Sequence, residues 1–221
     1  MASALFITER FAEANVYFDS IKEHMTGEDA FNWNYGISLA KTGVYKDAEH
    51  WLLAVKNESW REDFTYVYWL AKCYIWNDKA GEAWKLYLST NNSDESFHLL
   101  EFVANECYRK GKGGAFLYSV KAFDILLKLE PQNKEYWEGK LGSCAGVFQQ
   151  VIAGLASKED IYEIIKVLRS EDDKPQAIYA TRVMQKWVEN TKVERIKQAI
   201  GGSYGLDDSM SSLEDSDRTA R

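Results

Sequence analysis

Apolar residues recur along the chain at spacings of three and four positions, which is the period of an amphipathic α-helix. On this background a small residue returns about once every 35 positions, with separations of 34, 35 and 36 residues. A bulky residue follows each small one four positions later, and another apolar residue precedes each by three positions. The pattern predicts a series of similar helical units, whose repeated small residues are Ala14, Ala48, Ala83 and Ser119.

This period and pattern are typical of tetratricopeptide-type repeats, in which the two helices of a hairpin cross closely at the small residue. The first helix of each predicted unit carries its own small residue, at Gly36, Ala71 and Ala104. Pro131 stands where a unit should end and stops the helix. The sequence therefore predicts an all-α solenoid of helical hairpins, with a right-handed superhelix and extra C-terminal helices. The hairpins are expected near 28–56, 61–90 and 96–129.

The first unit is only half present. Its second helix is expected from about Glu9 to Ile21, and the register places Met1 inside its first helix. The apolar side of this second helix, with Phe11, Phe18 and Ile21, would then lack a cover, and terminal repeats normally need a polar cap. We expect the chain to be a piece of a longer array, or this end to be covered by something else, and we expect the isolated chain to self-associate or fray through this exposed N-terminal helix.

Local signals refine the helix boundaries. Thr26–Asp29 reads as a capping box, and Ser157–Asp160 reads as a cap of a later helix. Extra residues at Lys112–Gly114 lengthen the turn of the third hairpin.

Helices continue after Pro131 although the repeat period fades. Gly139, Gly142 and Gly146 share one face of a helix over about 136–150, where each glycine costs roughly 1 kcal/mol, so we expect another helix to approach closely there. Further helices are expected to Arg169 and from Pro175 onward. We predict tetratricopeptide-type repeats over 1–134, a helical extension packed on the array over 135–200, and a disordered acidic tail over 201–221.

Composition narrows the function classes. A formal net charge of −7 argues against nucleic-acid binding, which needs a clustered basic excess. No apolar run approaches the roughly 20 residues of a membrane span, and the N-terminus has no signal-peptide pattern. Cys73, Cys107 and Cys144 recur with the repeat rather than with zinc-ligand spacing, so we expect them to be buried in a cytoplasmic protein. Since no catalytic, cofactor or metal motif is found, the sequence favours protein binding over catalysis.

The inner face of such a solenoid is the candidate binding groove. Repeat positions two, five, nine and twelve point into it, and aromatic residues there suit protein hot spots. The alternative is that these side chains pack between repeats as core. The lysines and asparagines with which related co-chaperones grip a C-terminal carboxylate are absent from the corresponding positions. The candidates are Trp33, Ile37, Tyr68, Lys72, Ile75, Trp76, Glu101, Asn105 and Tyr108.

Beyond the repeat register, longer strings of sequence resemble the C-terminal third of intraflagellar transport protein 56, a tetratricopeptide subunit of ciliary transport complex B. The resemblance covers about residues 1–190. The strings that carry it include Asn32–Tyr35, Tyr66–Ile75, Ala83–Leu88, Ala104–Tyr108, Lys121–Asp124, Glu135–Lys140, Val167–Ser170 and Met184–Trp187.

The resemblance implies a non-enzymatic adaptor that docks on other complex B subunits, notably subunit 46. It further implies a place in the cilium or flagellum and at the basal body, with roles in cilium assembly and in carrying motility-related cargo. A second hypothesis stays open at this stage, namely a regulatory tetratricopeptide module that captures linear peptide motifs and has no connection with cilia.

Overall fold

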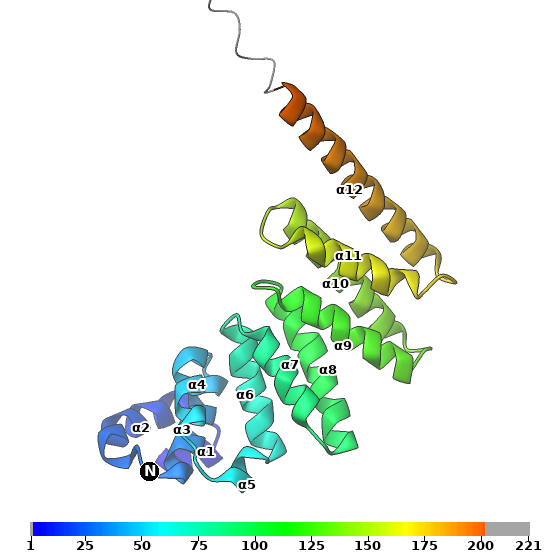
Figure 1. Ribbon diagram of the computed structural model, residues 1–221. Coiled ribbons are helices and arrows are strands. Elements are labelled where there is room, and N and C mark those ends of the chain that lie inside the picture. Colours follow the sequence, from blue (N-terminus) through cyan, green and yellow to red (C-terminus); the bar gives the residue numbers. More distant parts are fainter. Residues whose placement is uncertain (1, 202–221) are drawn as a thin grey trace, which may run out of the picture. The chain divides into compact units, whose positions relative to one another are not determined.

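The computed structural model describes residues 2–201, and the side chains of residues 4–191. No strand occurs in this described part of the chain, which confirms the predicted all-α class. The helices (Figure 1) are α1 Ala2–Ile7, α2 Phe11–Met25, α3 Asp29–Lys41, α4 Tyr45–Leu53, α5 Glu58–Arg61, α6 Phe64–Trp76, α7 Ala80–Ser89, α8 Ser93–Lys110, α9 Ala115–Leu129, α10 Lys134–Ile152, α11 Lys158–Arg169 and α12 Pro175–Gly201.

Helices pack in successive antiparallel hairpins, α3 with α4, α6 with α7 and α8 with α9, as the sequence predicts. The first helices also contact one another from hairpin to hairpin, α3 with α6 and α6 with α8, so they form a layer of their own. The short helix α5, between the first two hairpins, was not expected from the sequence. We call α3, α6 and α8 the first-helix layer.

The predicted small residues lie in the packed interior of the hairpins. Gly36 shows why size matters there, because a Cβ atom added to it would lie 2.8 Å from Cγ of Leu52 on α4. Ser119 is fully buried, and its hydroxyl donates to the carbonyl oxygen of Ala104 at 2.8 Å. Pro131 is exposed just beyond the end of α9. The fully buried small residues are Ala14, Ala48, Ala71, Ala83, Ala104 and Ser119.

Helix α10 takes the place of another first helix, because it packs against both α9 and α8. Its three glycines accommodate aromatic rings from these helices. A Cβ atom at Gly139 would lie 2.5 Å from the Phe123 ring, and one at Gly146 would lie 2.6 Å from the Phe116 ring. At Gly142 it would meet the Tyr108 hydroxyl at 2.9 Å. Close approach of neighbouring helices thus explains the glycine face.

The two predicted caps have different outcomes. Ser157 and Asp160 form the expected reciprocal cap, since Oγ of Ser157 accepts from the Glu159 N–H at 3.3 Å and the Asp160 carboxylate accepts from the Ser157 N–H at 3.2 Å. The capping box at Thr26–Asp29 is wrong. Helix α3 begins at Asp29 without a side-chain cap. The Asp29 carboxylate instead binds the backbone N–H groups of Lys56 and Asn57, each at 2.8 Å.

The N-terminal helices differ from the expectation in one respect. Phe18 was predicted to lie on an uncovered side, but it is only 5% exposed because it packs on the rings of Phe31 and Tyr35 from α3. Phe11 is half-buried against Phe6 of the short helix α1. Ile21 remains exposed.

The chain divides into two compact units, Met1–Ile164 and Ile165–Arg221. The domain boundaries expected after residues 134 and 200 stay predictions, and the predicted tail lies outside the described residues apart from Gly201.

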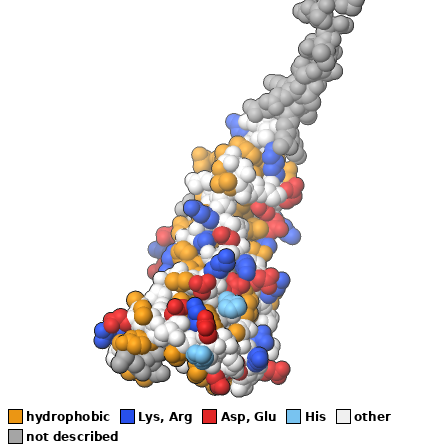
Figure 2. Space-filling view, turned by 90° about the vertical axis from the view of Figure 1, so that its left-hand side faces the viewer, with side chains coloured by type: hydrophobic (Ala, Val, Ile, Leu, Met, Phe, Trp, Pro, Cys, Tyr) orange, Lys and Arg blue, Asp and Glu red, His pale blue; other side chains and the backbone are white. Residues whose placement is uncertain are grey.

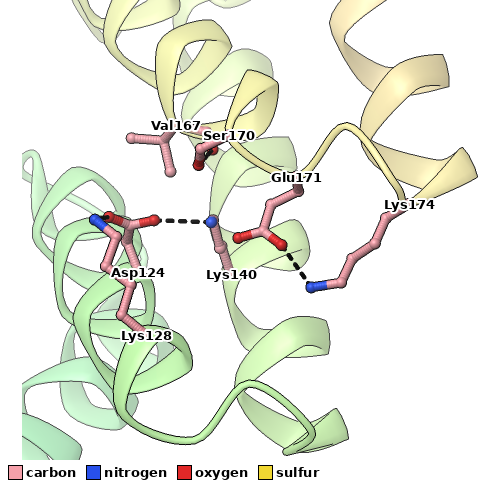
Figure 3. Close-up of polar contacts among 7 residues, drawn as sticks. All are labelled: Asp124, Lys128, Lys140, Val167, Ser170, Glu171 and Lys174. Atoms are coloured by element: carbon pink, nitrogen blue, oxygen red, sulfur yellow. Dashed lines mark hydrogen bonds and ion pairs between the residues drawn. The ribbon is translucent and has the colours of Figure 1, made fainter.

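Figure 3 shows ion pairs in each of the two units. In the first, the Asp124 carboxylate pairs with Lys140 at 2.8 Å and Lys128 at 2.7 Å; in the second, Glu171 pairs with Lys174 at 2.6 Å.

Candidate protein-binding surface

A line of charged and aromatic side chains crosses the first-helix layer from α3 to α8. Two ammonium groups lie near the Trp69 ring on α6, with Lys41 Nζ at 5.6 Å and Lys72 Nζ at 5.4 Å from its centroid. Both distances are within the range of cation–π attraction. Arg109 continues the line on α8 with a side chain that is 65% exposed. We call Lys41, Trp69, Lys72, Asn105 and Arg109 the first-helix strip.

A buried carboxylate lies beneath this strip. The Glu106 side chain is only 3% exposed, and three groups compensate its charge. It accepts a hydrogen bond from Nε1 of Trp76 at 2.8 Å, pairs with Arg109 at 2.9 Å, and lies 4.0 Å from Nζ of Lys72. Because buried charges are tolerated only when they are paired and hydrogen-bonded, Glu106 acts as a polar joint between α6 and α8.

Trp76 is held from several sides. Its ring stacks on Tyr45 of α4, with centroids 5.4 Å apart and an interplanar angle of 17°. Nζ of Lys110 lies 5.5 Å from the Trp76 ring centroid and donates to the Trp76 carbonyl oxygen at 2.8 Å. With its indole N–H bound to Glu106, this tryptophan already uses its ring and its donor inside the fold.

Two of the predicted groove residues are core residues. Ile37 is 3% exposed and Ile75 is fully buried, so neither side chain can reach a ligand on the surface. The groove prediction is wrong for this pair, because both side chains point from the first helices into the packed interior.

The other predicted residues lie nearer the surface. Tyr68 is half-buried, with its ring centroid 4.0 Å from that of Phe102. Glu101 accepts a short hydrogen bond from the Tyr136 hydroxyl. Asn105 is exposed and donates to the Glu101 carbonyl oxygen of its own helix, while Tyr108 is 44% exposed.

Trp33 lies at an open site. Its indole packs edge to face with Trp60 of α5, with centroids 5.8 Å apart, and at a tilt against Tyr66 at 5.6 Å. A cavity of about 320 Å³ opens beside the two indoles. We call it the Trp33–Trp60 pocket, and its lining residues are Ala30, Trp33, Asn34, Ser59, Trp60 and Asp63.

The second unit contains a cavity of about 260 Å³ along α12. Its charged lining residues have both signs, Arg169 and Arg182 against Glu171 and Asp172, so its walls favour no single kind of ligand.

The cysteines do not provide reactive thiols. All three are free and buried, as the sequence predicts. Burial raises the pKa of the thiols of Cys73, Cys107 and Cys144 to about 12, which leaves almost no thiolate near neutral pH. Among the side chains that the structure describes, no group of three His, Cys, Asp or Glu residues could hold a metal ion. Within the same residues, no helix combines the length and apolar character needed to cross a bilayer.

On the face drawn in Figure 2, basic, acidic and hydrophobic side chains are interspersed, and neither charge forms a continuous field. Recognition on such a surface depends on local sites, where a few side chains of suitable chemistry converge.

Sequence reasoning missed several residues that the structure brings together. Trp69 lies one position after Tyr68, just outside the assumed groove register, and Lys41 lies four positions after Ile37. Glu106 carried a usable signal, because it is a carboxylate next to the buried Cys107. Trp60 had no signal in the repeat pattern, since it comes from the connection between two hairpins.

Comparison with known proteins identifies the family. A family model described as intraflagellar transport protein 56 matches residues 1–196. A curated Caenorhabditis elegans protein, "Intraflagellar transport protein 56 homolog", is 30% identical over 197 residues, which are 88% of this chain and 33% of that protein. The chain therefore spans about a third of the length of this relative. No solved structure matches. The chain belongs to the intraflagellar transport protein 56 family.

Proposed function

We propose that this chain is a non-enzymatic interaction scaffold of intraflagellar transport complex B, and that it binds partner proteins through its first-helix layer. Family membership supports an intraflagellar transport role. The observation that carries the binding role is the first-helix strip, where the exposed Lys41 and the partly buried Lys72 lie near the Trp69 ring, and the exposed Arg109 pairs with a buried carboxylate. Aromatic and arginine side chains of this kind are the common anchors of protein interfaces.

The partners in this proposal are other complex B subunits, with subunit 46 the first to test. The site of action is the cilium or flagellum and the basal body, where the scaffold supports assembly and the transport of motility-related cargo. The positively charged side chains of the strip would favour partner segments that carry carboxylates. Because Lys41 and Arg109 are exposed, their charges affect the association rate and the specificity of binding more than the total affinity.

Co-purification from flagellated cells tests this proposal. The parent chain is expected to retain complex B subunits, and the pair Lys41→Glu with Asn105→Glu is expected to lose them, because both changes place carboxylates on the strip, where they repel the carboxylates of the partner. Lys46→Glu is the matched control, since Lys46 is an exposed lysine on α4, outside the first-helix layer. Retention of complex B subunits by the strip variant would contradict the proposed surface, and their absence with the parent chain would contradict the proposed function.

Self-association through the N-terminal helix also remains part of the proposal. Because Phe18 is buried, the exposed large apolar side chains of α2 that could carry self-association are Val16, Tyr17 and Ile21, which are 68%, 43% and 41% exposed. Val16→Lys with Ile21→Glu is expected to give a monomer in light scattering. If the parent chain is already monomeric, the proposed self-association is wrong.

A further inference from the structure

The Trp33–Trp60 pocket combines an aromatic wall with a single negative charge. Two indoles form its apolar part, and Asp63 is the only charged residue among the six that line it. With a volume of about 320 Å³ it is at the small end of ligand sites, which suits one long side chain rather than a whole ligand.

The Asp63 carboxylate has capacity for a ligand. Its Oδ1 accepts a hydrogen bond from the Thr65 N–H at 2.7 Å and so caps α6. Its Oδ2 accepts no hydrogen bond from the described residues. Neither Trp33 nor Trp60 donates its indole N–H to an acceptor in the same part of the chain.

Among the side chains that the structure describes, no cation lines the pocket. Arg61 is the nearest cation in sequence to Asp63, but it does not line the cavity. It acts on the Tyr66 hydroxyl, whose pKa is raised by burial and lowered to a smaller extent by Arg61. The segment Lys56–Asp63 carries three carboxylates against two cations, which leaves the surroundings mildly acidic.

We propose that the Trp33–Trp60 pocket binds an arginine side chain of a partner protein. A guanidinium is flat and weakly hydrated, so it can lie on an indole face while its N–H groups donate to a carboxylate. The pocket supplies both elements, the indoles of Trp33 and Trp60 and the free oxygen of Asp63. This inference rests on the proposed scaffold role, because the ligand belongs to a bound partner, and it names a second, acid-bearing contact beside the basic first-helix strip.

The test uses the full chain with nitrogen-15 label and a short peptide, acetyl-Gly-Gly-Arg-Gly-Gly-amide, followed through the indole N–H signals of the tryptophans. The signals of Trp33 and Trp60, assigned with single Trp→Phe variants, are expected to shift in a saturable way. The same peptide with citrulline, which has the shape of arginine without its charge, is expected to bind at least fivefold more weakly.

Asp63→Asn is the decisive variant. Asparagine caps α5, α8 and α10 in this chain through its side-chain oxygen, so the substitution removes the charge and keeps the cap. We expect it to melt like the parent and to bind the arginine peptide roughly fivefold more weakly. Asp94→Asn, an exposed acid in the first turn of α8, is the matched control and should bind like the parent.

Three outcomes would overturn the inference: an arginine peptide that shifts neither indole signal, equal binding by Asp63→Asn, or equal binding of the citrulline peptide. Equal binding of a lysine peptide would overturn the assignment to arginine. A failure of any of these arms leaves the proposed function standing as long as the parent chain still retains complex B subunits and the strip variant loses them.

Discussion

Two tryptophan sites of opposite character lie on the first-helix layer and the neighbouring short helix α5. At one end of α6, Trp76 is stacked on Tyr45, bonded to Glu106 and fixed by Lys110. Near the other end, Trp33 and Trp60 pack edge to face beside an open pocket, and neither indole N–H has an acceptor in the described part of the chain. The same residue type therefore supports the fold at one site and is free for a ligand at the other. The difference is set by what surrounds each ring.

The largest expected effect is that of Trp76→Ala. It removes a stacked ring and leaves the buried Glu106 carboxylate without one donor, so it should lower the free energy of unfolding by about 3 kcal/mol. Trp60→Ala should cost less than about 1 kcal/mol, because this side chain is already 38% exposed. Denaturant unfolding of both variants measures the contrast. Similar losses would mean that the two sites do not differ in the way described.

Glu106→Gln should have the next largest effect. The amide keeps the shape but gives up the charge that compensates Arg109 and Lys72, so a loss of about 1–2 kcal/mol in unfolding free energy is expected. The matched control is Asp63→Asn at the open site, which should cost nothing measurable. If Glu106→Gln leaves the unfolding free energy unchanged, the polar joint between α6 and α8 contributes little to stability.

Two substitutions of Asp63 are expected to differ in their effect on stability, by less than the changes above. Asp63→Ala removes the side-chain cap of α6 and should cost about 1 kcal/mol, whereas Asp63→Asn keeps it. Thermal melting of the pair distinguishes the cap from the charge. If both variants lose the same stability, the charge of Asp63 contributes to the fold, and the carboxylate is not free for a partner.

The smallest expected effect is a pH dependence at Asp124. Like that of Glu106, its carboxylate is largely buried and paired with cations of the chain itself. Burial alone would raise its pKa, but hydrogen bonds from Lys128 and Lys140 and their charges lower it below the ordinary value of 3.8. A lowered pKa in the folded state means that the stabilisation is present above the unfolded value and is lost as pH falls through the folded value.

The unfolding free energies of the parent and of Asp124→Asn should therefore differ at pH 6 by an amount below about 1 kcal/mol, and this difference should shrink below about pH 4. Denaturant titrations at both pH values measure it. A difference that grows on acidification would have the wrong sign for a carboxylate with a lowered pKa.

The repeat pattern could be predicted from the sequence because it depends on small side chains that recur at a fixed interval. Ala48 and Ala83 return at the repeat interval, and a small residue is required wherever two helices cross closely, so the hairpins and their boundaries follow. The glycine face of α10 was readable for the same reason, although the identity of the approaching rings was not.

The binding surface was less readable, because it depends on contacts between distant segments. Ile37 and Ile75 match the groove register but point into the core, and a register error of about half a helical turn, roughly two residues, exchanges the two faces of a helix. Trp60 comes from a connection whose path no repeat specifies. The same applies to Asp29, the first residue of α3, whose carboxylate binds a segment 27 residues away instead of taking part in a capping box.

The most direct test of the account is to add purified subunit 46 of complex B to the nitrogen-15-labelled chain and to follow the indole N–H signals. The account predicts that the signals of Trp33 and Trp60 shift or broaden, since their rings face an open pocket, while the signal of Trp76 keeps its position because its ring and donor are already engaged. A spectrum in which Trp76 responds and Trp33 and Trp60 do not would contradict it, as would the absence of any change.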